Sequence, residues 1–258
     1  MALGKGIQKT PEKQKFHKDT FTDSRGHTLL YRLLAPTVDA VHINAHAEKS
    51  SPPQTPLVLV LHGSGERGND NSAQLDNGVA ELLGSTTATT TFPCFALVPQ
   101  CPPEYRWVEV NWETERVVRP PSPSLPLSAT VELLQVLLHR HPIDPQRLYL
   151  IGLSMGGFGV WDLLSRWPQR FAAAIPICGG ADDNAITTAQ AVPVWAFHGE
   201  CDPIVNVQHS RRAVAALQAA GGTPRYTEYP RVGHDAWAHA FAEPNLLPWL
   251  FAQRRAAT

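Results

Sequence analysis

The feature that most constrains this chain is a Gly-x-Ser-x-Gly pattern at residues 152–156. An apolar run, residues 148–151, precedes it, and residues 158–164, which have helical apolar spacing, follow it. This order is the nucleophile-elbow pattern, in which a tight strand-to-helix turn exposes the serine. A Cβ on either glycine would crowd such a turn. The motif alone is common by chance, so it is the context that favours Ser154 as a catalytic nucleophile over a serine in a glycine-rich turn.

Apolar runs alternate with helix-like segments along the chain, which predicts an α/β fold with a mostly parallel central sheet and helices on both faces. Residues 16–23 and 27–35 are predicted as an additional N-terminal hairpin. Continuous apolar runs are typical of strands buried on both faces. The predicted strands are 57–61, 94–98, 147–151, 172–177, 192–197 and a more polar edge strand at 225–229, and the predicted helices are 129–140, 155–167 and 210–220.

The length and composition indicate one domain. The chain has 258 residues, of which 43% are hydrophobic, enough for one α/β domain with a sizeable core. We expect residues 1–15 to form an N-terminal tail and residues 16–258 a single catalytic domain. The proline-containing segments 36–56 and 119–127 are predicted to be loops within that organisation.

The charge balance argues against nucleic acid and against an anionic membrane as partners, because 22 basic and 23 acidic residues leave a net charge of −1. No apolar run approaches the roughly 18 residues of a membrane span. The first 18 residues are polar and basic, without the apolar region of a signal peptide, so a cytoplasmic location is expected. A secreted protein that had lost its leader would look the same. The oligomeric state is left open.

The four cysteines, Cys94, Cys101, Cys178 and Cys201, match no zinc or redox spacing. No histidine pair has metal-ligand spacing, so we expect neither a metal nor another cofactor. Free thiols are the favoured interpretation. A disulfide between Cys178 and Cys201 stays open, because both lie just past predicted strands.

A serine nucleophile needs a carboxylate and a histidine, which should follow strands that come after Ser154. The segment after the strand at 192–197 contains two acidic candidates, and Asp202 is favoured over Glu200 because it lies in a turn farther past the strand end. A turn aspartate before a proline is the non-catalytic alternative.

His234 is the predicted base, because it follows a glycine in the loop after the last strand. His239, five residues on, is the alternative and is expected in the final helix. His62 and His198 also follow strands, but they do not fit the order nucleophile, acid, histidine and are expected to be structural or supporting residues.

The tetrahedral intermediate of such a reaction needs two N–H donors. One is expected from Met155, directly after the nucleophile. The glycine-rich segment 62–68 follows the strand at 57–61, so its backbone can approach the site. We assign the second donor to Ser64, with Gly65 as the alternative and as a residue close to the substrate.

Together these motifs resemble the α/β-hydrolase superfamily from Leu57 to the C-terminus. The resemblance is closest to serine carboxylesterases and "predicted peptidases" similar to dienelactone hydrolases, polyhydroxybutyrate depolymerases and feruloyl esterases. Dienelactone hydrolases themselves carry cysteine at the elbow, which argues against that activity here. The motifs are His62-Gly63-Ser64-Gly65-Glu66-Arg67-Gly68, Val98-Pro99-Gln100-Cys101-Pro102, Gly152-Leu153-Ser154-Met155-Gly156-Gly157, His198-Gly199-x-x-Asp202-Pro203 and Gly233-His234-x-x-Trp237.

The resemblance implies a cofactor-independent serine carboxylesterase acting on a small-molecule or polymeric ester, with a serine peptidase or an acetyl-sugar esterase as alternatives. Residues 179–191 are too few for a large lid, so an open site is expected. Trp107 and Trp112 are predicted either to form an aromatic wall for aryl, short-chain or polyester substrates or to anchor their long loop. Trp237 is predicted either to line the pocket or to anchor the last loop.

Overall fold

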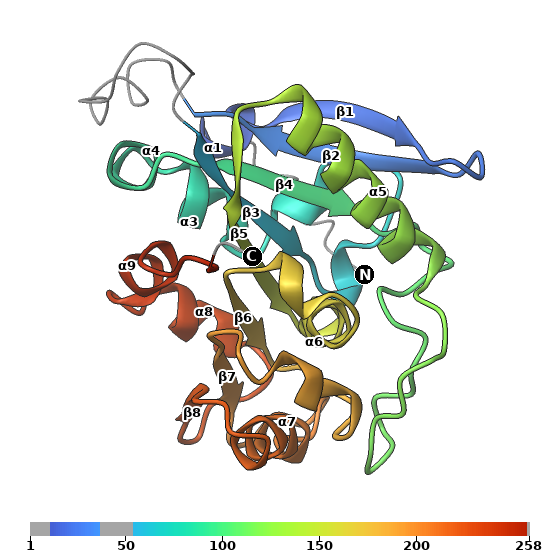
Figure 1. Cartoon of the computed structure of the whole chain (residues 1–258), viewed down its shortest axis with the longest axis vertical. Helices are drawn as coiled ribbons and strands as arrows, with labels where there is room; N and C mark the ends of the chain where they lie inside the picture. Colours follow the sequence, from blue (N-terminus) through green and yellow to red (C-terminus); the bar gives the residue numbers. More distant parts are fainter. Residues whose placement is uncertain (1–10, 37–53, 257–258) are drawn as a thin grey trace, which may run out of the picture.

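A single eight-stranded sheet with helices on both faces organises the chain (Figure 1). The computed structural model describes residues 11–36 and 54–256. The strand order is β1-β2-β4-β3-β5-β6-β7-β8; β2 is antiparallel to β1 and β4, and the other neighbouring strands are parallel. The predicted α/β class is confirmed. The strands are β1 His17–Thr22, β2 Thr28–Leu34, β3 Thr55–Leu61, β4 Phe95–Gln100, β5 Ile143–Leu153, β6 Ala173–Ile177, β7 Trp195–Gly199 and β8 Arg225–Tyr229.

The central strands contribute side chains to two hydrophobic cores, one on each face of the sheet, because successive side chains of a strand point to opposite faces. In β3, Leu57, Leu59 and Leu61 belong to the core that includes residues of α5, α6 and α7, whereas Val58 and Val60 belong to the core that includes residues of α3, α8 and α9. Figure 1 shows these helices on the two faces of the sheet. The helices are α1 Pro11–Gln14, α3 Val79–Gly84, α4 Thr86–Thr91, α5 Leu125–Arg140, α6 Met155–Arg166, α7 Gln208–Ala219, α8 Ala236–Phe241 and α9 Leu246–Phe251, with 3₁₀ turns η1 Ser64–Glu66, η2 Ala73–Leu75, η3 Pro168–Arg170 and η4 Ala185–Ala189.

Two predicted starts lie four residues too late: α5 begins at 125 instead of the predicted 129, and β5 begins at 143 instead of the predicted 147. Ser124 caps α5 by accepting the N–H of Leu127 at 3.3 Å, and Pro126 is tolerated because the first helical turn needs no intrahelical N–H donor. The prolines that suggested a loop at 119–127 therefore belong partly to a helix start. The edge strand β8 occupies the predicted residues.

The end of the expected N-terminal tail is attached to the domain. Residues 11–14 form α1, where Lys13 pairs with Asp76, and the Lys15 ammonium donates to the carbonyl of Gly84 at 2.6 Å. Residues 1–10, and residues 37–53 of the loop predicted at 36–56, lie outside the described part of the chain. Among the described helices, none combines the length and the apolarity that a membrane crossing requires.

The register of the parallel strands brings their carboxyl ends to one edge of the sheet. Leu61 of β3 lies opposite Gly152 of β5. The last residues of β5 and β6, Leu153 and Ile177, are opposite each other, and the last residue of β7 is opposite that of β8. The loops that follow these strands carry the candidate acid, base, nucleophile and oxyanion donors, so they start from the same edge.

The turn after β5 is packed backbone against backbone. A Cβ on Gly156 would lie 1.9 Å from the carbonyl oxygen of Leu61, and one on Gly152 would lie 2.2 Å from the carbonyl oxygen of Gly156. Real Cβ atoms do not approach so closely, so the predicted need for glycine at both positions is confirmed.

Gly156→Ala should lower the free energy of unfolding by at least about 3 kcal/mol, because rigid backbone rather than a flexible side chain must move. Urea unfolding of the variant and the wild type measures the difference. Gly65→Ala is the matched control: its Cβ would meet no atom within 4 Å, and we expect a change within about 0.5 kcal/mol. Equal stability of Gly156→Ala and Gly65→Ala would contradict the steric argument.

Candidate active site

Ser154 occupies the turn between β5 and α6 in a conformation that few non-glycine residues adopt, with φ 53° and ψ −117°. Its N–H donates to the carbonyl of Ile177 at 2.8 Å, and its carbonyl accepts the N–H of Phe158 at 3.2 Å. Both backbone groups are thus held by neighbouring elements. The side chain projects from the N-terminus of α6, where the helix dipole favours negative charge.

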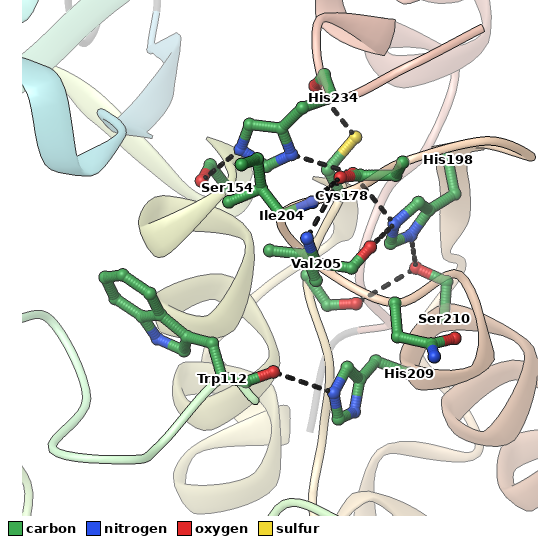
Figure 2. Close-up of polar contacts among 12 residues, drawn as sticks. Trp112, Ser154, Cys178, His198, Ile204, Val205, His209, Ser210 and His234 are labelled. Carbon is green, nitrogen blue, oxygen red and sulfur yellow. Dashed lines mark hydrogen bonds and ion pairs between the residues drawn. The ribbon is translucent and has the colours of Figure 1, made fainter. Parts of the chain in front are cut away.

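Three residues predicted from distant parts of the sequence meet here (Figure 2). The hydroxyl of Ser154 donates to His234 Nε2 at 2.8 Å, and His234 Nδ1–H donates to Asp202 Oδ2 at 2.7 Å. A carboxylate accepts hydrogen bonds but does not donate them, so Nδ1 carries the proton and Nε2 is free to accept. The serine is therefore hydrogen-bonded to a base in the tautomer that can take its proton.

The carboxylate of Asp202 is completely buried and has several donors. Its Oδ1 accepts the N–H groups of Ile204 and Val205, each at 2.9 Å, while His198 and His234 approach Oδ2. Burial by itself would raise the pKa of Asp202, but the hydrogen bonds from the two histidines and the two amides outweigh it and hold the pKa well below the usual range. Asp202 is thus an anion at neutral pH.

The alternative acid and base lie elsewhere. Glu200 is exposed, and its carboxylate accepts the N–H of Arg231 at 3.1 Å. His239 is an exposed residue of α8, not of the final helix α9, and its ring packs on Tyr229 with centroids 5.2 Å apart. Neither is part of the hydrogen-bonded chain that includes Ser154.

His62, at the end of β3, supports the loop that was predicted to hold the oxyanion. The residue is 1% exposed; its Nδ1–H donates to the carbonyl of Gly63 at 2.6 Å, and its Nε2 accepts the N–H of Cys101 at 2.9 Å. Burial lowers the pKa of His62 to about 4, so the ring is neutral. His62 therefore joins the loops after β3 and β4, in line with the supporting role expected for it.

The candidate oxyanion donors begin helices. Met155 is the first residue of α6 and Ser64 the first of η1. The first N–H groups of a helix have no acceptor within that helix. Ser64 is half-buried and Gly65 is exposed with open space around it. Ser64 and Gly65 both remain candidates for the second donor.

The aromatic residues differ in accessibility. Trp107 is fully buried and its Nε1–H donates to the carbonyl of His62 at 3.0 Å, so the expectation of a substrate-facing wall is wrong for this residue: it anchors the loop. Trp112 is half-buried and stacks on Phe158, one turn after the serine, with centroids 6.2 Å apart. Half-buried Trp237 packs edge-on against the His234 ring at 5.3 Å.

The four cysteines are free, so the Cys178–Cys201 disulfide is absent. Within the described residues, Cys178, Asp202 and His234 offer ligand atoms within 4.8 Å of one another, the spacing of a possible metal site. These groups are already engaged: Asp202 accepts from His234, and the Cys178 thiol donates to the His234 carbonyl at 3.4 Å. Burial, followed by the charge of Asp202, raises the pKa of Cys178 to about 12, so its sulfur is a neutral thiol at neutral pH.

The connection between β6 and β7 contains one short 3₁₀ turn, η4. Its 13 central residues, 179–191, are all described, and they form no helical cap of the kind that would cover the serine. The segment agrees with the expectation of a site without a large lid.

Comparison with known proteins agrees with this geometry. The chain has the α/β-hydrolase fold. Residues 126–243 match the phospholipase/carboxylesterase family, so this part of the chain is similar to carboxylesterase-family hydrolases. The fold matches the crystal structure of a thermostable esterase with a TM-score of 0.83 and 37% sequence identity, covering 94% of this chain and 64% of that one.

Two curated relatives are named a carboxylesterase and a depolymerase. "Probable carboxylesterase" of Oryza sativa subsp. japonica is 25% identical over 198 residues, 69% of this chain and 80% of the relative. Poly(3-hydroxyalkanoate) depolymerase C of Paucimonas lemoignei is 28% identical over 137 residues, 52% of this chain and 30% of the relative. This chain thus spans less than a third of the depolymerase.

The thiols should differ sharply in reactivity, because thiolate character and access control it. Burial raises the pKa of Cys94 and Cys178 to about 12 and raises that of Cys101 as well, whereas Cys201 is exposed. We expect Ellman's reagent to label Cys201 alone in the folded protein, even at pH 9, and all four thiols in guanidinium chloride. Cys201→Ser should abolish the labelling of the folded protein. A thiol that still reacts fast in this variant would contradict the burial of the other three cysteines.

Proposed function

We propose that this protein is a serine carboxylesterase in which Ser154 is the nucleophile, His234 the general base and acid, and Asp202 the residue that orients His234. The observation that carries the proposal is the unbroken hydrogen-bonded chain from the Ser154 hydroxyl through His234 to the buried Asp202 carboxylate. A serine hydroxyl becomes a useful nucleophile when an adjacent base accepts its proton.

The reaction has two halves. Ser154 Oγ attacks the ester carbonyl carbon while its proton passes to His234 Nε2. When the tetrahedral intermediate collapses, the ester C–O bond breaks and His234 returns the proton to the leaving alcohol. Water then attacks the acyl-enzyme, His234 takes a proton from it, and the carboxylic acid is released with Ser154 restored. Asp202 stabilises the imidazolium that forms in each half.

The oxyanion would be held by backbone N–H groups of two loops that start from the same sheet edge. The proposed donors are Met155, at the start of α6, and Ser64, at the start of η1, with Gly65 as the alternative to Ser64. Preorganised donors of this kind stabilise the charge that develops in the transition state more than that of the substrate.

The accessible apolar surface near the site favours esters with an apolar or aryl group. Ile204, whose N–H is bound by Asp202, is 58% exposed, and Trp112 lies beside the first turn of α6. An open site of this kind suits short-chain, aryl and polyester substrates, and one relative is named a poly(3-hydroxyalkanoate) depolymerase. A peptidase or an acetyl-sugar esterase would use the same three residues and is the alternative.

Ser154→Ala should abolish labelling by a fluorophosphonate probe and lower kcat for p-nitrophenyl acetate by at least about 10⁴-fold, because no other group can form the acyl-enzyme. Labelling on a gel and a burst of p-nitrophenol measure the two effects. Ser165→Ala is the matched control, since the Ser165 hydroxyl lies within α6 and donates to the Trp161 carbonyl at 2.8 Å. Labelling that survives in Ser154→Ala would refute the proposed nucleophile.

The ester and peptidase alternatives make different predictions for two chromogenic substrates. We expect steady turnover of p-nitrophenyl acetate and no measurable turnover of an amino-acid p-nitroanilide. Turnover of both substrates should be lost in Ser154→Ala if it arises from this site. Hydrolysis of the anilide without the acetate would favour the peptidase.

A further inference from the structure

Asp202 is contacted by a second histidine that the triad does not require. His198 lies on β7, and its Nε2 is 3.2 Å from Asp202 Oδ2, the same oxygen that accepts from His234 (Figure 2). The side chains of His198 and Asp202 are both completely buried. A buried polar pair of this kind is costly unless each group is satisfied, so its geometry is informative.

The neighbours of His198 set the direction of its hydrogen bonds. Its Nε2 faces two acceptors, the carbonyl oxygen of Val205 at 2.9 Å and the carboxylate of Asp202, so Nε2 carries a hydrogen. The other ring nitrogen, Nδ1, lies 2.7 Å from Ser210 Oγ, which is also 3.0 Å from the carbonyl oxygen of Gly179. The ring is therefore held on both sides, with its Nε2–H shared between the Val205 carbonyl oxygen at 2.9 Å and Asp202 Oδ2 at 3.2 Å.

Gly179, whose carbonyl accepts the Ser210 hydroxyl, also contacts α6, the helix that begins after Ser154. Gly179 packs directly on Gly157 of α6, where a Cβ on Gly179 would lie 2.5 Å from the Gly157 carbonyl carbon. Ser210 belongs to α7. A buried path from α6 through Gly179, Ser210 and His198 thus ends on the carboxylate that orients His234.

We propose that His198 is a positioning residue that acts through Asp202. It is a second contact of Oδ2 beside His234, and it helps the carboxylate keep the orientation in which His234 Nε2 faces Ser154. Without His198, Oδ1 would keep its two backbone donors, but Oδ2 would retain only His234, the residue whose orientation it has to set. This inference rests on the proposed esterase function, since its readout is that reaction.

The first test is His198→Leu, which removes the donor to Asp202. Hydrogen bonds to charged groups carry enough free energy for a loss of kcat on the order of 10- to 100-fold. We expect that loss with p-nitrophenyl acetate, together with a KM within about threefold of the wild type, because His198 touches no substrate. A folded His198→Leu with kcat within about threefold of the wild type would overturn the proposal.

A double-mutant cycle separates positioning from general damage to the core. In an Asp202→Asn background the carboxylate is already lost, so His198→Leu should lower kcat by less than about threefold there. His209→Leu is the matched control: His209 is 3% exposed, neighbours Ser210 on α7 and lies 3.2 Å from the Trp112 carbonyl oxygen. His209→Leu should lower kcat by the same factor in the wild type and in the Asp202→Asn background. The proposal would be contradicted if His198→Leu lowered kcat by the same factor in the Asp202→Asn background as in the wild type.

Conservative variants keep the test decisive if His198→Leu does not fold. The glutamine amide can reach the position of Nε2, whereas the shorter asparagine amide reaches only that of Nδ1. His198→Gln should therefore keep kcat closer to the wild type than His198→Asn does, and equal losses would overturn the proposal. If the wild-type protein neither hydrolyses the ester nor reacts with a fluorophosphonate, the proposed esterase function itself fails, a result distinct from any difference among the variants.

Discussion

Close approach of backbone to backbone around α6 is the constraint on which the rest of the site depends. A Cβ on Gly157 would lie 2.5 Å from the carbonyl oxygen of Ile177, and a Cβ on Gly156 would lie even closer to β3. The helix start is thereby locked between β3 and β6, and the strained backbone of Ser154 is kept where its N–H meets Ile177. Strain of this kind persists only where the surrounding structure fixes it.

The second requirement is a buried negative charge that stays ionised. Taking the Asp202 carboxylate out of water is costly, and the cost is offset by four donors from three places: its own turn, β7 and the loop after β8. Asp202 therefore links its own turn to β7 and to the loop after β8. His234 is held by a charge whose own position is fixed by other parts of the fold, which is what the proposed role of His234 as a base demands.

The parts of the site that could be predicted from sequence are those with local chemical rules. The elbow follows from two glycines around Ser154, and Asp202 and His234 follow from their places after strands, because parallel strands bring their carboxyl ends to one edge. Errors arose where several placements satisfy the same local pattern. A loop rich in proline and tryptophan gave no indication that Trp107 would point inward to the His62 carbonyl while Trp112 stays half-exposed. Prolines at 120–126 suggested a loop although a capped helix can begin there.

By itself, the sequence determined the fold class, the position of the sharp turn and the residue types that follow each strand, because apolar periodicity and glycine sterics act over a few neighbouring residues. Tertiary structure alone decided that His198 and His234 share one oxygen of Asp202, that the Cys178 thiol meets the His234 carbonyl and that Trp107 is a core residue. These contacts join elements whose separation depends on strand register and helix packing, and no local pattern in the chain encodes a distance between two such elements.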